Sequence, residues 1–177
     1  MRIIGGTHRS RIVTFPDAEG LRPTPDRVRE TLFNWLGQDM TGKRCLDLFA
    51  GSGALGLEAA SRGASEVVMI EKNRAVFRVL QENIKKLNFN NIALRNEDGL
   101  NFAGRGSERF DLIFLDPPFQ SDFFEKLLPL LSQQLSPQGF LYVESGTQLE
   151  AAEPWKIIKH GRAGAVHYQL LQLEQSS

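Results

Sequence analysis

The sequence has only one cysteine, Cys45, among its 177 residues. A single cysteine cannot form an internal disulfide, so the fold must be stabilised by its core. No uncharged apolar run reaches the roughly 18 residues that a membrane-spanning helix needs. The first eleven residues, MRIIGGTHRSR, also lack the apolar centre of a signal peptide. We therefore expect a cytoplasmic location.

The chain also lacks net charge, because 21 basic residues balance 21 acidic ones. The charges are not evenly distributed, since residues 1–29 carry an excess of three positive charges and the remainder is correspondingly acidic. A basic arm on an acidic body is typical of a protein with one surface that meets phosphates. The arginines that we expect to contact a nucleic acid are Arg9 and Arg11, placed on one face of a short strand, and Arg22, Arg27 and Arg29, placed around the start of a helix.

The length and the apolar content, 41%, are typical of one globular domain with a full core. We expect this domain over residues 41–177, preceded by an appendage over residues 1–40. In the appendage, RIIGG and RSRIVTF predict a hairpin, and DRVRETLFNWLG predicts a helix. Thr24 is expected to cap that helix, with Pro25 at its first position.

From residue 44 onward, extended and helical patterns alternate. The expected strands span residues 44–49, 66–71, 91–96, 109–116 and 139–145. Such alternation predicts an α/β fold with a parallel sheet covered by helices on both faces. Two extended runs near the end, residues 155–164 and 165–174, predict a closing antiparallel pair. Pro129 predicts that the segment before the fifth strand forms two short helices or one kinked helix.

A glycine-rich segment, DLFAGSGALGLEAA, directly follows the first of these strands. Gly51, Gly53 and Gly56 have the G-x-G-x-x-G spacing that lets a backbone approach a ligand at a helix start. Dinucleotide-binding proteins share this spacing, but they hold an anionic pyrophosphate. Asp47 would repel phosphate and favour a cation. The segment therefore favours S-adenosylmethionine, which carries a sulfonium and an ammonium group and no phosphate.

Two further acids follow the next strands. Glu71 lies where an acid can accept both hydroxyls of a ribose. Taken alone, it would be better explained as a solvated charge paired with Lys72 or Arg74, but its distance from the glycine segment favours the ribose role. Asp98 could accept a hydrogen bond from an adenine amino group or cap a helix, and the two roles are compatible.

The run FDLIFLDPPF ends a buried strand with an acid, two prolines and an aromatic ring. An exocyclic base amine must pyramidalise before it attacks a methyl group, and acceptors around its hydrogens favour that geometry. The Asp116 carboxylate and the Pro117 carbonyl supply such acceptors. Phe119 offers a face on which an extruded base can stack. This pattern predicts methyl transfer to a base amine, and it calls for no metal.

These segments resemble known proteins. DLFAGSGALGLEA, Glu71, Asp98 and DPPF resemble the class I S-adenosylmethionine-dependent amino-methyltransferases. Over nearly the whole chain, MRIIGG…RSR…RPTPDRVRETLFNWL, GFLYVES and KHGRAGAVHYQLL are similar to the ribosomal small-subunit methyltransferase D family.

The resemblance implies a Rossmann-like fold with a seven-stranded, mostly parallel sheet whose last strand is antiparallel, and an N-terminal hairpin that grips RNA. It also implies methylation of N2 of one guanine in 16S rRNA, presented by an assembled or assembling small subunit. We expect the protein to act as a monomer. The resemblance gives target-base roles to Asp116, Pro117 and Phe119, to which we add Pro118 as a substrate contact. It gives cofactor roles to Gly51, Gly53, Glu71 and Asp98, to which we add Asp47, Phe49 and Ser52.

Three other functions are compatible with parts of the sequence. An adenine-N6 DNA methyltransferase would use the same DPPF chemistry, but the chain has no separate target-recognition domain. A nicotinamide-dependent oxidoreductase would leave Asp47 and DPPF unexplained. An inactive RNA-binding module would not need the acids that the chain retains.

Overall fold

The structure is a computed structural model that describes residues 1–16, 21–118 and 122–175. The helical elements are η1 (Gly6–His8), α1 (Asp26–Leu36), α2 (Ala54–Ser61), α3 (Arg74–Lys86), α4 (Gly99–Arg105) and α5 (Asp122–Leu131). The strands are β1 (Arg44–Asp47), β2 (Glu66–Ile70), β3 (Ile92–Arg95), β4 (Phe110–Leu115), β5 (Leu135–Ser145), β6 (Trp155–Ala163) and β7 (Val166–Leu173).

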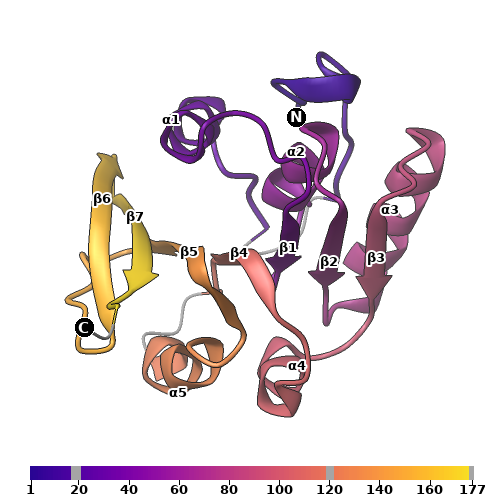
Figure 1. The fold of residues 1–177 in the computed structure, drawn as a ribbon. Helices are drawn as coiled ribbons and strands as arrows, with labels where there is room; N and C mark the ends of the chain where they lie inside the picture. Colours follow the sequence, from indigo (N-terminus) through magenta and orange to yellow (C-terminus); the bar gives the residue numbers. More distant parts are fainter. Residues whose placement is uncertain (17–20, 119–121, 176–177) are drawn as a thin grey trace.

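The seven strands form one sheet in the order β3-β2-β1-β4-β5-β7-β6 (Figure 1). Strands β1 to β5 are parallel to one another, and β7 is antiparallel to both β5 and β6. The prediction of a mostly parallel sheet closed by an antiparallel last strand is confirmed. The strand order reverses between β1 and β4, and ligands of open α/β sheets bind beyond the carboxyl ends of the strands at such a point.

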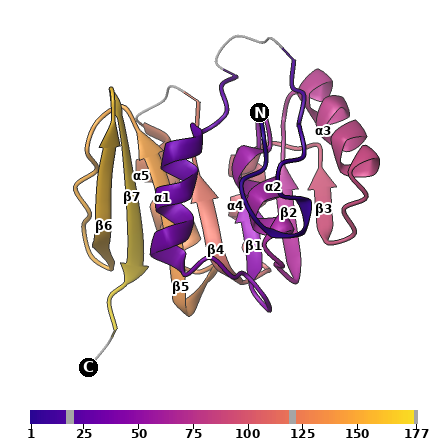
Figure 2. The same cartoon turned by 90° about the horizontal axis from the view of Figure 1, so that it is seen from above.

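Helices cover both faces of the sheet, as the alternating pattern predicts. Apolar residues of α1, α2 and α3 pack in one core cluster, and those of α4 and α5 pack in another. Figures 1 and 2 show α1 and α2 on one side of the strands and α4 and α5 on the other. Cys45 lies inside the first cluster, where burial raises the pKa of its thiol to about 12, so it is an unreactive core residue.

The N-terminal arm, residues 1–16, lies over α2 as an outer layer (Figures 1 and 2). The predicted hairpin is reduced to one antiparallel bridge, between Arg2 and Ile12, with η1 at its tip. The buried carboxylate of Glu58 on α2 accepts hydrogen bonds from the backbone N–H groups of Ile4 and Gly5, both at 2.9 Å. Ile3 and Val13 donate to the Arg11 and Met1 carbonyls across the hairpin at 3.0 and 2.8 Å, and Glu58 satisfies the next two donors from outside the arm.

One local prediction needs correction, and one of two alternatives is decided. Thr24 does not cap α1: Pro25 holds the N-cap position, and the Thr24 hydroxyl turns instead to Glu144. Pro129 lies inside the single helix α5. Of the two predicted alternatives, two short helices or one kinked helix, the structure therefore has the single helix, in which Pro129 supplies no backbone N–H donor.

No helix among the described residues is both long enough and apolar enough to cross a membrane.

Candidate active site

Four strands end at or beside an acidic residue, at the edge of the sheet that we call the carboxyl edge. Asp47 pairs with Phe114 across β1 and β4, and Phe114 pairs with Tyr142 across β4 and β5. Side chains two residues apart on a strand point to the same face. Asp116 and Glu144 therefore follow Phe114 and Tyr142 on the face that carries α1, α2 and α3. The sheet register thus brings Asp47, Asp116 and Glu144 together.

Glu71, at the end of β2, organises the glycine segment. Its Oε1 accepts a hydrogen bond from the Gly51 N–H at 2.8 Å, and its Oε2 accepts one from the Asn73 N–H at 2.8 Å. It forms none of the described ion pairs with Lys72 or Arg74. Each carboxylate oxygen keeps acceptor capacity after these bonds, so Glu71 can still receive the hydroxyls of a ribose.

The glycines allow this loop to turn tightly into α2. Gly53 is the N-cap of α2 and has φ +84°, a conformation that other residues rarely adopt. Gly56 lets the helix approach the sheet, since a Cβ atom there would lie 3.0 Å from Asp47 Oδ2. Ser52 is buried, and its hydroxyl accepts a hydrogen bond from the Ala54 N–H at 3.3 Å. It therefore supports the turn from inside.

Asp47 lies behind this loop with only 3% of its surface exposed. Its Oδ2 accepts a hydrogen bond from the Gly56 N–H at 3.0 Å. Burial raises the pKa of Asp47 to about 7, and this one backbone bond opposes the rise only in part. A buried acid that ionises near neutral pH repels a pyrophosphate and is stabilised by a cation. The acid behind the loop and the acceptors of Glu71 therefore fit S-adenosylmethionine.

Asp98 and Phe49 lie at the same edge of the sheet. Asp98 is the N-cap of α4, with Oδ1 accepting hydrogen bonds from the N–H groups of Leu100 and Asn101 at 2.7 and 3.3 Å. The predicted capping role is confirmed, and Lys72 Nζ lies 3.3 Å from the other oxygen, Oδ2. The Phe49 ring lies beside the start of α4, since a Cβ atom on Gly99 would lie 3.0 Å from it.

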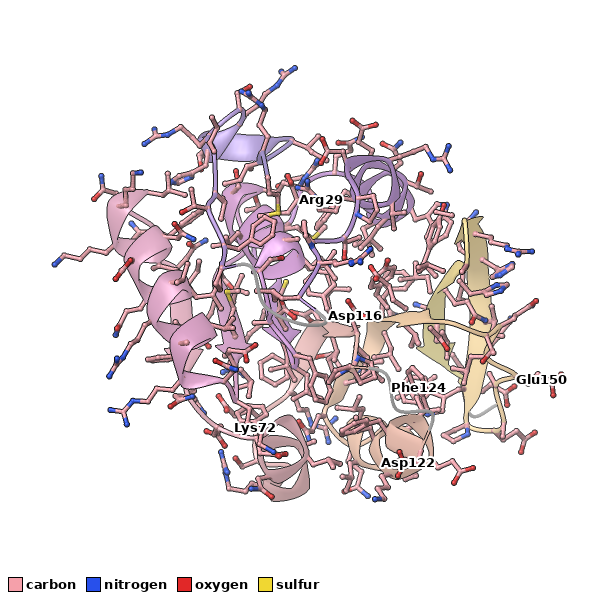
Figure 3. All side chains as sticks on the ribbon, turned by 180° about the vertical axis from the view of Figure 1, so that it is seen from behind. Arg29, Lys72, Asp116, Asp122, Phe124 and Glu150 are labelled. Atoms are coloured by element: carbon pink, nitrogen blue, oxygen red, sulfur yellow. The ribbon has the colours of Figure 1, made fainter. Side chains whose placement is uncertain are left out.

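Asp116 lies in a cluster of hydroxyl and carboxyl groups. Glu144 Oε1 accepts hydrogen bonds from the Thr24 hydroxyl at 2.8 Å and the Tyr142 hydroxyl at 2.7 Å. Asp116 as a whole is partly exposed, but its carboxyl group is desolvated. This desolvation raises the pKa of Asp116 well above its ordinary value, and the charge of Glu144 and a hydrogen bond with it add to the rise. Figure 3 shows Asp116 near the centre of the molecule.

The structure describes two of the three remaining residues of the DPPF segment. Pro117 is half-buried and Pro118 is exposed beside Asp116. Phe119 lies outside the described residues, so its predicted stacking role stays a prediction.

The sequence reasoning missed Glu144, Tyr142 and Thr24 as site residues. One signal was available for Glu144, which ends a strand in the same way as Asp47, Glu71 and Asp116 do. Thr24 had no such signal, because only the placement of α1 brings it to the carboxyl edge.

The prediction that Arg29 contacts a nucleic acid is wrong. Its side chain is 1% exposed and is enclosed within the protein. Its guanidinium pairs with Glu58 at 3.0 Å and with Asp26, and it donates to the Thr24 carbonyl at 3.0 Å. Arg29 is therefore a buried link between α1 and α2.

The other arginines are exposed, but they lie at opposite edges of the sheet. Arg22 and Arg27 flank Thr24, which lies at the carboxyl edge. Neither Arg9 nor Arg11 lies in the predicted strand, since Ser10 between them has φ +70°. Arg9 is in the turn after η1 and lines an open cavity of about 820 Å³ that also includes Gln38 and Gly63. This cavity lies at the opposite end of α2 from the glycine loop, about 12 Å along a helix of eight residues. It is separate from the cluster of acids.

The sheet order, the acid behind the glycine loop and the acid after β4 define a class I S-adenosylmethionine-dependent methyltransferase. The chain belongs to the family described as Conserved hypothetical protein 95, whose model matches residues 1–172. It is 42% identical to ribosomal RNA small subunit methyltransferase D of Escherichia coli over 98% of this chain and 90% of that protein. It is 39% identical to the protein of the same name from Haemophilus influenzae, over 97% of this chain and 93% of that one.

A solved structure shows the same similarity. It is described as putative methyltransferase yhhF from Escherichia coli, and it is 41% identical with a TM-score of 0.90 over 99% of both chains. The resemblance to the small-subunit methyltransferase D family that the sequence motifs indicated is confirmed.

Proposed function

We propose that this protein transfers the methyl group of S-adenosylmethionine to the exocyclic N2 amine of one guanine in 16S rRNA. The observation that carries the proposal is the shared edge of Asp47, Glu71 and Asp116, which joins a site for a cationic cofactor to acceptors for an amine. The printed names of the relatives supply the kind of RNA.

The acids have different tasks in this proposal. Glu71 holds the loop and receives the ribose, Asp47 faces the cationic part of the cofactor, and Asp98 receives the adenine amino group. Bound S-adenosylmethionine supplies an activated methyl group, whose bond to sulfur breaks with both electrons going to sulfur. Asp116 and the Pro117 carbonyl orient the amine, so catalysis is chiefly alignment of nitrogen, carbon and sulfur.

The exposed arginines support an RNA surface in two parts. Arg22 and Arg27, with Pro118, border the base site, and Arg9 and Arg11 lie at the far end of the N-terminal arm. RNA phosphates that reach both parts must come from a large, folded substrate. We infer that residues 1–40 contact RNA and that the protein acts as a monomer, in the cytoplasm, on an assembled or assembling small subunit.

The test offers the protein and labelled S-adenosylmethionine to small ribosomal subunits, naked rRNA and duplex DNA, followed by mass spectrometry of the nucleosides. We expect N2-methylguanosine from ribosomal particles and no product from DNA. N6-methyladenine as the product would replace the proposal by the adenine-N6 alternative. Binding of a nicotinamide dinucleotide in place of S-adenosylmethionine, measured by calorimetry, would favour the oxidoreductase.

A further inference from the structure

Asp116 and Glu144 form a carboxyl pair at the carboxyl edge. They follow Leu115 and Val143, which are partners across β4 and β5, so the register sets the two acids side by side on neighbouring strands. Two carboxylates side by side in a desolvated site repel each other, which favours a state in which the pair holds one proton. None of the ion pairs formed by the described residues includes Asp116 or Glu144. The pair is therefore neutralised by a shared proton and not by a basic side chain.

The surrounding groups decide which partner holds that proton. The hydroxyls of Thr24 and Tyr142 both donate to Glu144 Oε1, at 2.8 and 2.7 Å. Two such donors stabilise a carboxylate much more than a neutral acid. These bonds favour placing the shared proton on Asp116, whose pKa burial raises well above its ordinary value.

The other titratable groups that face the pair are acids and phenols. Asp47 approaches from β1, Tyr142 from β5, and Tyr168 from β7, where it pairs with Glu144 in register. Burial and the charge of Glu144 raise the pKa of Tyr142 well above its ordinary value, so its hydroxyl stays a donor at neutral pH. None of these groups accepts hydrogen bonds from two side-chain hydroxyls as Glu144 does. We therefore take Glu144 as the proton acceptor.

An amine that gains a methyl group must lose a proton, and a protonated Asp116 cannot be the final acceptor by itself. We propose that Glu144 receives this proton through Asp116, a relay that rests on the proposed methylation of an amine. The amine nitrogen forms a bond to the methyl carbon while the carbon–sulfur bond breaks toward sulfur. An N–H proton passes to the free oxygen of Asp116 as the proton of the Asp116 hydroxyl passes to Glu144. Asp116 ends protonated, as it began, and Glu144 returns its proton to water.

The first experiment needs no RNA. Aspartate labelled with ¹³C at the carboxyl carbon reports the protonation of Asp116 by NMR, with the signal assigned by its loss in Asp116→Asn. We expect Asp116 to be protonated at pH 7 in the wild type and in Glu150→Gln, an exposed control far from Asp116 in Figure 3. In Glu144→Gln we expect the pKa of Asp116 to fall, because the charge of Glu144 is removed while the burial of Asp116 remains. An ionised Asp116 in the wild type at this pH would overturn the relay.

The second experiment measures single-turnover methyl transfer against pH. The relay needs Glu144 ionised and Asp116 protonated, so the wild-type rate should be bell-shaped. Glu144→Gln keeps an acceptor for Thr24 and Tyr142 but cannot take a proton. We expect it to lower the rate by about 100-fold and to lose the bell shape, with cofactor affinity unchanged within about threefold. Glu150→Gln should match the wild type.

Tyr142→Phe provides a second variant if Glu144→Gln does not fold. It removes one donor to Glu144, so the acidic side of the profile should move to higher pH. An unchanged profile in these variants would overturn the relay. If the product is N6-methyladenine and Glu144→Gln still loses the bell-shaped pH profile, the proposed guanine substrate is wrong and the relay is retained. The two proposals can therefore fail separately.

Discussion

The guanidinium of Arg29 lies 3.0 Å from the carboxylate of Glu58, and the two side chains are 1% and 0% exposed. The same carboxylate accepts from the N–H groups of Ile4 and Gly5 and pairs with Arg62 at 3.0 Å. One buried acid therefore joins the N-terminal arm, α1 and α2.

Replacing Arg29 by methionine should destabilise the protein. Removing one partner of a buried ion pair typically costs about 3–5 kcal/mol, and we expect the lower end of this range because Arg62 still pairs with Glu58. Urea unfolding measures the loss, with Arg27→Met on the exposed side of α1 as the control, expected within about 0.5 kcal/mol of the wild type. Equal stability of the two variants would contradict the linking role of Arg29.

Glu71→Ala should weaken the binding of S-adenosylmethionine. The change removes the acceptor that fixes the Gly51 and Asn73 N–H groups as well as the acceptor proposed for the ribose. A hydrogen bond to a charged group contributes about 1.5–3 kcal/mol, so the dissociation constant should rise by roughly 10- to 100-fold. Isothermal titration calorimetry measures it, and an unchanged constant would place the ribose elsewhere.

Asp116→Ala should abolish methyl transfer while leaving cofactor affinity nearly unchanged, because its partner is the base. Calorimetry and a methyl-transfer assay on small subunits separate the two properties. Asp122→Ala is the control, since Asp122 is an exposed acid at the start of α5. Strong loss of cofactor binding in Asp116→Ala would show that this residue contacts the cofactor.

Gly53→Ala and Gly37→Ala should differ although both glycines have a positive φ. At Gly37, with φ +93°, a new Cβ atom meets nothing within 4 Å, so only the backbone strain of about 1–2 kcal/mol applies. At Gly53 the Cβ atom would lie 2.6 Å from Leu80 Cδ2 and 3.0 Å from Leu57 Cδ1. We expect a larger loss of unfolding free energy for Gly53→Ala and weaker cofactor binding for this variant alone. Urea unfolding and calorimetry test both points.

The stability of the protein without cofactor should fall between about pH 4 and pH 7 through Asp47. Burial raises its pKa from 3.8 to about 7 in the folded state. In this window the folded protein retains a proton that the unfolded chain has released, so the free energy of unfolding declines as pH rises. Asp47→Asn should show a flatter dependence in urea unfolding at pH 5, 6, 7 and 8. A slope equal to that of the wild type would indicate that Asp47 is ionised throughout.

The prediction succeeded where chemistry and spacing are local. Alternating apolar runs indicated the core strands. The glycine spacing placed a tight turn before α2, because glycine readily adopts a positive φ such as that of Gly53. It failed for Thr24, whose sequence position suits a helix cap but whose hydroxyl bonds to a residue 120 positions away. It failed for Arg29 for a related reason, since an arginine on a helix is exposed unless a distant acid faces it.

The sequence by itself determined the class of fold, the acids that end the strands and the loop that a cationic cofactor needs, because each depends on residue type and short spacing. Only the tertiary structure decided which of these acids meet. The register between β4 and β5 sets Glu144 beside Asp116, and the packing of α1 brings Thr24 to them. Strand register and helix placement arise from contacts spread over the whole core, so no short segment of the chain encodes them.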